Sequence, residues 1–232
     1  MDRMNIKMGR DALFDLMASE QMLVQRRKRK HITTNSNHWY KKYPNLIRGI
    51  TPDGPNQIWV SDITYIKTQR EFLYLFLITD AYSKKILGYR LAKNLDSIHA
   101  VNSLQDAIKY TSQPISGLIH HSDRGIQYCS KEYTDLLNKR GILISMTENG
   151  DPRENAIAER INGILKDEYL NEEITKQGDL AEEKLKKVIE KYNKLRPHLS
   201  CNMLTPEIAH TSKGSLKRKW KNYYRKTVKL AV

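Results

Sequence analysis

The stretch Ile58–Lys67, IWVSDITYIK, decides the fold. Its β-branched and aromatic residues are typical of a strand, and one acid, Asp62, interrupts them. Two stretches of the same character follow, Phe72–Thr79 and Ile86–Leu91, with only short turns between them. Short turns join antiparallel neighbours, so the three stretches predict an antiparallel meander.

After the meander, the pattern alternates between helix and strand. We expect two further strands, over Gly117–His121 and over Ile142–Met146. We expect four helices: Ser97–Tyr110 with Asp96 as its N-cap, a helix capped by Ser130, Glu154–Tyr169, and Gly178–Leu195. Two strands that follow crossover helices extend the meander to a mixed five-stranded sheet flanked by helices. This α/β order matches the ribonuclease H-like fold.

The two ends of the chain differ from the middle. Residues 1–50 hold an expected short helix, Gly9–Gln21, and a basic run formed by Arg26, Arg27, Lys28, Arg29 and Lys30. Like charges this close repel, so the run is either a solvated linker or, as the overall charge favours, an arm that contacts phosphates. The turn-rich stretch Thr51–Pro55 predicts the boundary to a core over residues 51–212.

Residues 213–232 form a basic tail with eight Lys or Arg and no acid. Trp220, Tyr223 and Tyr224 lie between these basic residues. Two interpretations stay open: cations that pair with phosphates while aromatics stack on bases, or a basic helix whose aromatics dock on the core.

Composition limits the class of protein. The 232 residues carry a formal net charge of +14, from 40 Lys and Arg against 26 Asp and Glu, which favours a nucleic-acid partner. No apolar run approaches the ~18 residues of a membrane span, and the N-terminus has no signal-peptide pattern, so we expect a cytoplasmic protein with no membrane contact. Cys129 and Cys201 form no Cys-x-x-Cys pair, which argues against a zinc site and favours burial.

Three acids stand inside otherwise apolar elements, where an acid is costly unless it has a function. Asp62 interrupts the first strand, although an edge-strand aspartate facing water gives the same pattern. Asp123 follows the fourth strand, although aspartate also favours turns. Glu159 shares a helix face with Asn162 and Lys166, although a solvated face looks alike. Phosphodiester cleavage with magnesium needs a few carboxylates that converge from different parts of the chain, and these three acids are candidates for them.

Around these acids the chain resembles a known family. The segments are Trp59–Tyr65, His120–Tyr128, Asn155–Glu159 with Lys166 and Glu168, Tyr192–Asn193, Arg196–His198 and Thr205–Pro206, and 35 residues (124–158) separate Asp123 from Glu159. Together they resemble the OrfB-type, DDE-type transposases of insertion sequences, whose core belongs to the retroviral integrase superfamily. The resemblance covers residues 52–212, whereas any one segment alone would be weak.

The resemblance implies roles for individual residues. Asp62 and Asp123 would hold one Mg²⁺ and Asp62 and Glu159 a second, with Mn²⁺ able to substitute. Lys166 would contact DNA near the cut, and Asn155 and Asn162 would position phosphates. The activity implied is cleavage of double-stranded DNA at transposon ends and strand transfer to a target. His120 and His121 have no partner cysteines, so packing of strand and turn is favoured over zinc.

The resemblance also implies partners. A homo-oligomer on DNA is expected in a bacterial, nucleoid-associated setting. Residues Gly9–Lys30 are similar to only the last part of the family's helix-turn-helix region, so a protein from an upstream frame is a candidate partner for recognising the ends. Two other functions stay open: a nuclease of the same fold that only hydrolyses, and a catalytically inactive DNA-binding remnant or regulator.

Overall fold

The computed structural model describes residues 8–23, 38–68, 71–111, 114–148, 152–170 and 182–219. The chain divides into two compact units, residues 1–32 and 33–232. The first unit contributes helix α1 (Arg10–Ser19), which lies within the range expected for it and has no buried residue. The predictions made for the basic run 26–30 and the aromatic residues of the tail lie outside the described residues.

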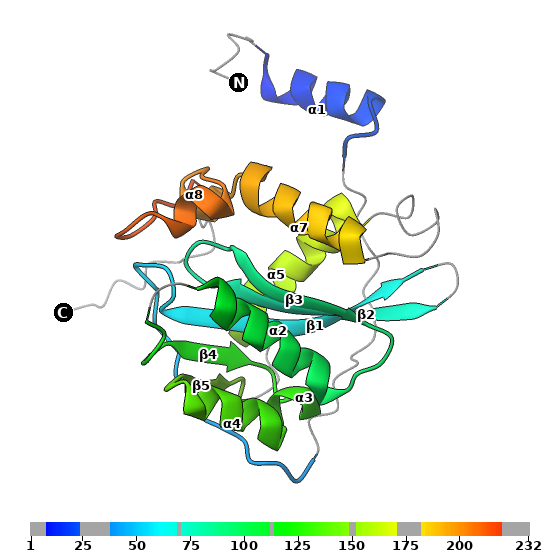
Figure 1. The fold of residues 1–232 in the computed structure, drawn as a ribbon. Coiled ribbons are helices and arrows are strands. Elements are labelled where there is room, and N and C mark those ends of the chain that lie inside the picture. Colours follow the sequence, from blue (N-terminus) through cyan, green and yellow to red (C-terminus); the bar gives the residue numbers. More distant parts are fainter. Residues whose placement is uncertain are drawn as a thin grey trace, which may run out of the picture. The chain divides into compact units, whose positions relative to one another are not determined.

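The second unit is built on a mixed sheet of five strands in the order β3-β2-β1-β4-β5 (Figure 1). β1 pairs antiparallel with β2, and β2 antiparallel with β3, which confirms the predicted meander. β4 and β5 continue the sheet in parallel with β1. The strands are β1 Ile58–Lys67, β2 Phe72–Asp80, β3 Ile86–Ala92, β4 Ile119–Ser122 and β5 Leu143–Met146.

Helices cover both faces of the sheet (Figure 1). Alternate side chains of β2 supply the two cores: Phe76 joins the cluster formed with α2 and α4, and Leu77 joins the cluster formed with α5 and α7. The helices of the second unit are α2 Ser97–Tyr110, α3 Ile126–Cys129, α4 Lys131–Lys139, α5 Ala156–Ile164, α7 Glu182–Leu195 and α8 Pro206–His210. This three-layer arrangement confirms the ribonuclease H-like prediction.

Helix α2 crosses β3 at Gly88. A Cβ placed on this glycine would lie 2.1 Å from the backbone oxygen of Ser103 and 3.0 Å from the Cβ of Ala107. Only a residue without a side chain lets the helix approach the strand this closely. The close contact fixes α2 against the outer strand of the meander.

The predicted start of one strand was wrong, whereas the two predicted helix caps are in place. β4 begins at Ile119 instead of Gly117, because Gly117 has φ +82° and still belongs to the preceding turn. Asp96 is the N-cap of α2 as predicted, but its side chain makes no capping hydrogen bond. Ser130, in contrast, accepts a hydrogen bond from the backbone N–H of Tyr133, which confirms it as the cap of α4.

The single helix expected over Glu154–Tyr169 has three parts. A 3₁₀ turn, η2 (Pro152–Asn155), precedes α5, and a π-helical turn, η3 (Leu165–Tyr169), follows it. The backbone N–H of Leu170 donates to the carbonyl of Leu165 at 2.7 Å, five residues back, which widens the helix by one residue. π-helical turns are frequent at functional sites, and this one carries Lys166.

Candidate catalytic site

The site begins where β4 ends beside β1. These strands are parallel, and Val60 pairs with His121. In each pair of this register the β4 residue lies 61 positions after its β1 partner in the sequence. Continued by two residues, this register brings Asp123, just after β4, level with Asp62. Neighbouring strands lie ~4.8 Å apart, so the two acids are adjacent on the sheet. β1 also pairs with β2 through Asp62 and Leu77, so Asp62 is not on an edge strand.

Asp62 is half-buried and held from two sides. Its Oδ1 accepts a hydrogen bond from the backbone N–H of Ile63 at 2.9 Å, and its Oδ2 accepts one from Nδ2 of Asn162 at 2.7 Å. The pKa of Asp62 is nevertheless raised from 3.8 to about 7. Burial is the largest cause, the Asp123 carboxylate the second, and Glu159 adds a smaller repulsion. Asp123 and Glu159 therefore both act on Asp62 through space.

Asp123 owes its position to a tight turn. Its Oδ1 accepts a hydrogen bond from the backbone N–H of Gly125 at 2.9 Å, and the hydroxyl of Ser122 donates to its backbone oxygen at 3.0 Å. The turn chemistry foreseen for this aspartate is thus present. It does not exclude a role at the site, because the same turn holds the carboxylate level with Asp62.

Helix α5 is attached to β1 by two buried asparagines. Nδ2 of Asn155 donates to the backbone oxygen of Ser61 at 2.9 Å. Seven residues after Asn155, Nδ2 of Asn162 donates to Oδ2 of Asp62. Glu159 lies between them at i+4 from Asn155, so it shares their face of the helix. Its own side chain is exposed. The proposed contacts of the two asparagines with phosphates stay predictions.

Lys166 extends this face into η3. Its Nζ lies over the ring of Tyr65, 4.4 Å from the centroid. A cation is attracted to the face of an aromatic ring. The contact thus places the Nζ of Lys166 beside β1, at a residue three positions along the strand from Asp62. Its contact with DNA stays a prediction.

Three buried polar atoms near the acids make no hydrogen bond to the described part of the chain. They are the hydroxyl of Tyr128 and the Oδ1 atoms of Asn155 and Asn162. Burial raises the pKa of Tyr128 above its usual range, and the Asp62 and Asp123 carboxylates raise it further, which places the hydroxyl near both acids. Tyr128 belongs to a motif quoted above, but nothing in the sequence marks its hydroxyl as facing the site.

The donor set fits a hard divalent cation. Carboxylate and amide oxygens are the ligands Mg²⁺ prefers, and the orphaned amide oxygens can accept hydrogen bonds from waters such an ion retains. No three metal-binding side chains are already clustered among the residues for which the structure gives positions. A bound cation would offset the repulsion of Asp62 by the Asp123 and Glu159 carboxylates, which contributes to the raised pKa of Asp62.

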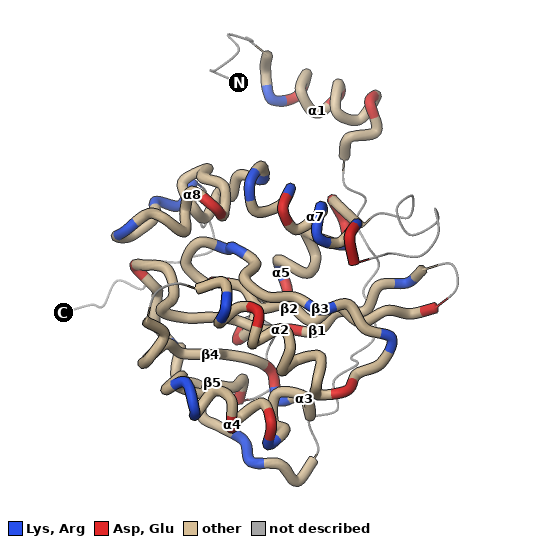
Figure 2. Tube along the Cα trace, viewed as in Figure 1, with Lys and Arg blue, Asp and Glu red and all other residues tan. Residues whose placement is uncertain are grey.

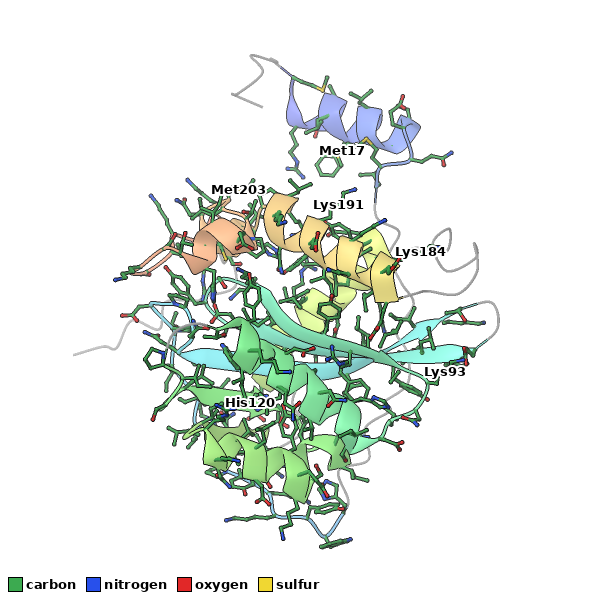
Figure 3. The ribbon with its side chains drawn as sticks, in the orientation of Figure 1. Met17, Lys93, His120, Lys184, Lys191 and Met203 are labelled. Carbon is green, nitrogen blue, oxygen red and sulfur yellow. The ribbon has the colours of Figure 1, made fainter. Side chains whose placement is uncertain are left out.

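His120 and His121 are packing residues, as expected. Nε2 of His120 hydrogen-bonds the hydroxyls of Ser61 (2.7 Å) and Tyr133 (2.8 Å), and Figure 3 labels His120 between β4 and α4. Burial lowers the pKa of His120 to about 3 and that of His121 to about 4. Both rings are therefore neutral, and His120 joins β1 to α4. Cys129 and Cys201 are buried and free, as predicted.

The Arg196–His198 segment is tied to η3. The guanidinium of Arg196 forms two hydrogen bonds with the Glu168 carboxylate, at 2.5 and 2.6 Å. Such a bidentate pair fixes geometry as well as charge. The segment thus supports the turn that carries Lys166, a role the sequence alone did not reveal.

Comparison with known proteins identifies the family of this chain. The integrase core domain family matches residues 52–152, and a second profile of the same description matches residues 140–206. The insertion element IS600 uncharacterized 31 kDa protein of Shigella sonnei is 35% identical over 203 residues, 87% of this chain and 74% of that protein. The transposase for insertion sequence element IS629 of Shigella sonnei is 34% identical over 164 residues, 71% of this chain and 55% of the relative.

Solved structures share the fold. A chain of the simian T-cell lymphotropic virus intasome, solved with PP2A regulatory subunit B56 gamma, is 25% identical with a TM-score of 0.63, covering 76% of this chain and 61% of that one. The HTLV-2 integrase catalytic core domain in complex with magnesium is 22% identical with a TM-score of 0.55, covering 68% and 97%. Fold and sequence thus define an integrase-type core. The chain belongs to the insertion-sequence transposases of the integrase superfamily.

Proposed function

We propose that this transposase cuts DNA at the ends of an insertion sequence and joins the freed ends to new DNA, with Asp62, Asp123 and Glu159 as the catalytic acids. One observation carries the proposal: the β1–β4 register brings Asp62 level with Asp123, and Glu159 acts on Asp62 from α5. The magnesium bound to the HTLV-2 integrase core supports a divalent-metal mechanism.

Each residue has a definable task in this mechanism. Asp62 would share in holding both Mg²⁺ ions, Asp123 one and Glu159 the other, and Mn²⁺ would substitute. Bound there, the ions supply Lewis acidity and align the attacking and leaving oxygens. Asn162 orients the Asp62 carboxylate by its hydrogen bond. Lys166, above Tyr65, would hold the DNA backbone beside the acids, and Asn155 and Asn162 would position phosphates.

The partners follow from the same proposal. The substrate is double-stranded DNA, both the transposon ends and the target. Two ends must be joined, so we propose a homo-oligomer on DNA. The similar chain in the simian T-cell lymphotropic virus intasome supports this proposal. A helix-turn-helix protein from an upstream frame is a candidate partner for recognising the ends.

The test is a product analysis. The chain would be incubated with duplexes of its flanking element ends and Mg²⁺, and the products separated on denaturing gels. We expect cut strands and larger joined strands. Cut strands without joined ones would indicate a nuclease that only hydrolyses. Bound but uncut DNA in both Mg²⁺ and Mn²⁺ would indicate an inactive DNA-binding remnant.

Variants assign the chemistry to the acids. Asp62→Asn, Asp123→Asn and Glu159→Gln keep side-chain shape and remove charge, so each should reduce cutting to background while DNA binding survives. The effects should not add in double variants, because the acids act as one unit. Asp135→Asn, an exchange on the outer helix α4, is the matched control and should cut normally. A site variant that cuts at the wild-type rate would remove that residue from the mechanism.

A further inference from the structure

An exposed aromatic pair lies outside the site described so far. Trp39 is 87% exposed, and its indole stacks on the ring of Tyr40 with centroids 4.4 Å apart and planes 21° from parallel. Tryptophan is highly buried on average, so an indole this exposed calls for an explanation. Tyr40 and Tyr43 are half-buried against the core on the α2 and α4 side, so the indole stacks on a ring that the core holds in place.

The segment is fixed beside the acids by hydrogen bonds. Nε2 of His38 donates to the backbone oxygen of Arg124 at 2.7 Å, one residue from Asp123. Further along, the backbone N–H of Met146 donates to the carbonyl of Pro44 at 3.3 Å, which holds the segment along β5. The ring of His38 meets that of Tyr40 edge-on, with centroids 5.5 Å apart, and Tyr40 carries the indole of Trp39, so a chain of three rings leads from the turn of Asp123 to the indole.

The charged side chains of this segment are positive. The segment 38–43, His-Trp-Tyr-Lys-Lys-Tyr, contains no acid, and Nζ of Lys41 lies 5.0 Å from the ring centroid of Tyr43. Burial and the Asp123 carboxylate raise the pKa of the Cys129 thiol, whereas the charges of Lys42 and Arg124 lower it, so these two cations lie with Asp123 around the same point of α3. Cations interleaved with an exposed aromatic are typical of surfaces that bind single-stranded nucleic acid.

We propose that Trp39 is a stacking platform for an unpaired base at the DNA end held by the acids. Bases inside a duplex stack on one another and offer no free face, whereas a frayed or single-stranded end does. Such an end lies next to the cutting point, and the rings of His38 and Tyr40 connect the indole to Arg124 there. The inference rests on the proposed function, because it requires DNA at Asp123.

The test compares two DNA probes on the full chain. One is a duplex of the element end with a three-nucleotide single-stranded overhang carrying 2-aminopurine, and the other is the same duplex without the overhang. Wild-type protein should quench the 2-aminopurine signal and bind the overhang probe more tightly. Trp39→Ala should weaken overhang binding about 5- to 100-fold and leave blunt-duplex binding within about twofold. Trp39→Phe should keep most of the affinity and confirm that the fold is intact.

The control and the contrary outcomes are distinct. Leu195→Ala alters another exposed apolar side chain, 66% exposed on α7, and should change neither probe. Equal overhang binding by Trp39→Ala and wild type would overturn the stacking proposal and leave the proposed function standing. Failure of the wild type to bind either probe would overturn both. A changed oligomeric state or melting temperature in Trp39→Ala, with overhang binding unaltered, would show that the indole covers protein instead of DNA.

Discussion

At the scale of single residues, Asn162 controls the acid at the centre of the site. Its amide donates to Oδ2 of Asp62, and both side chains lie on the α5 side of β1. Loss of such an outer hydrogen bond typically lowers metal affinity 10- to 100-fold, because the ligand loses its orientation. We expect Asn162→Ala to weaken Mg²⁺ and Mn²⁺ binding at least about tenfold in calorimetric titrations. Asn138→Ala, exposed on α4, should bind as wild type. Unchanged affinity in Asn162→Ala would contradict this role.

Asp62 also makes the stability of the metal-free protein depend on pH. Its folded-state pKa of about 7 exceeds the ordinary 3.8, because burial and the Asp123 carboxylate penalise the ionised form. The stabilisation from protonated Asp62 is complete below pH 3.8 and is lost as the pH rises through 7. We therefore expect Asp62→Asn to unfold at increasingly higher urea than wild type between pH 5 and 8, by about 1–2 kcal/mol at pH 8, allowing for partial exposure. A difference that stays constant with pH would contradict the raised pKa.

At the scale of elements, one buried side chain of α7 locks the helix to the sheet. Oδ1 of Asn193 accepts from the backbone N–H of Ile86, and its Nδ2 donates to the carbonyl of the same residue, both at 3.0 Å. Asn193→Ala would leave both backbone groups buried without partners where β3 begins. We expect a loss of about 2–3 kcal/mol in the free energy of unfolding. Lys194→Ala, exposed one residue further on, should stay within about 0.5 kcal/mol, and a similarly small loss for Asn193→Ala would disprove the lock.

Elements could be predicted where local chemistry decides them. β1 and α2 match their expected ranges because runs of β-formers and a periodic helix end at clear turn signals. The division of residues 152–170 into three parts could not be predicted, because the apolar periodicity does not show where the backbone hydrogen bonds change from one helix type to another. The positions of Asn155 and His38 depend on contacts far away in the sequence, with Ser61 and Arg124. Motif spacing indicated Asp62, Asp123 and Glu159, but only the β1–β4 register shows why the first two meet.

At the scale of the whole molecule, the excess of positive charge is unevenly placed. Acidic and basic positions alternate along α7, and basic positions elsewhere are scattered over α4 and the loops (Figure 2). Such mixed surfaces attract DNA only weakly and without orientation. The densest basic run in the sequence is 26–30, outside the described residues. None of the described helices is long and apolar enough to cross a membrane.

If that run contacts phosphates, its removal should change how DNA binding depends on salt. Each lost contact with duplex DNA lowers the log–log slope by about 0.9, because fewer counterions are released. We expect neutralising residues 26–30 to glutamine to flatten the slope by up to about 4.5 and to weaken binding similarly on all sequences, measured by fluorescence anisotropy from about 50 to 300 mM salt.

The matched control removes the same charge from another place. Helix α7 carries five exposed lysines, Lys184, Lys186, Lys187, Lys191 and Lys194, of which two are labelled in Figure 3. Exchanging these five for glutamine lowers the net charge equally, from +14 to +9 (14 − 5), so it reproduces the long-range loss of attraction. Its salt slope should nevertheless remain near wild type, because distant charges release few counterions. An equal flattening of the slope in both variants would mean that only net charge matters. An unchanged slope after residues 26–30 are exchanged for glutamine would mean that the run is a linker.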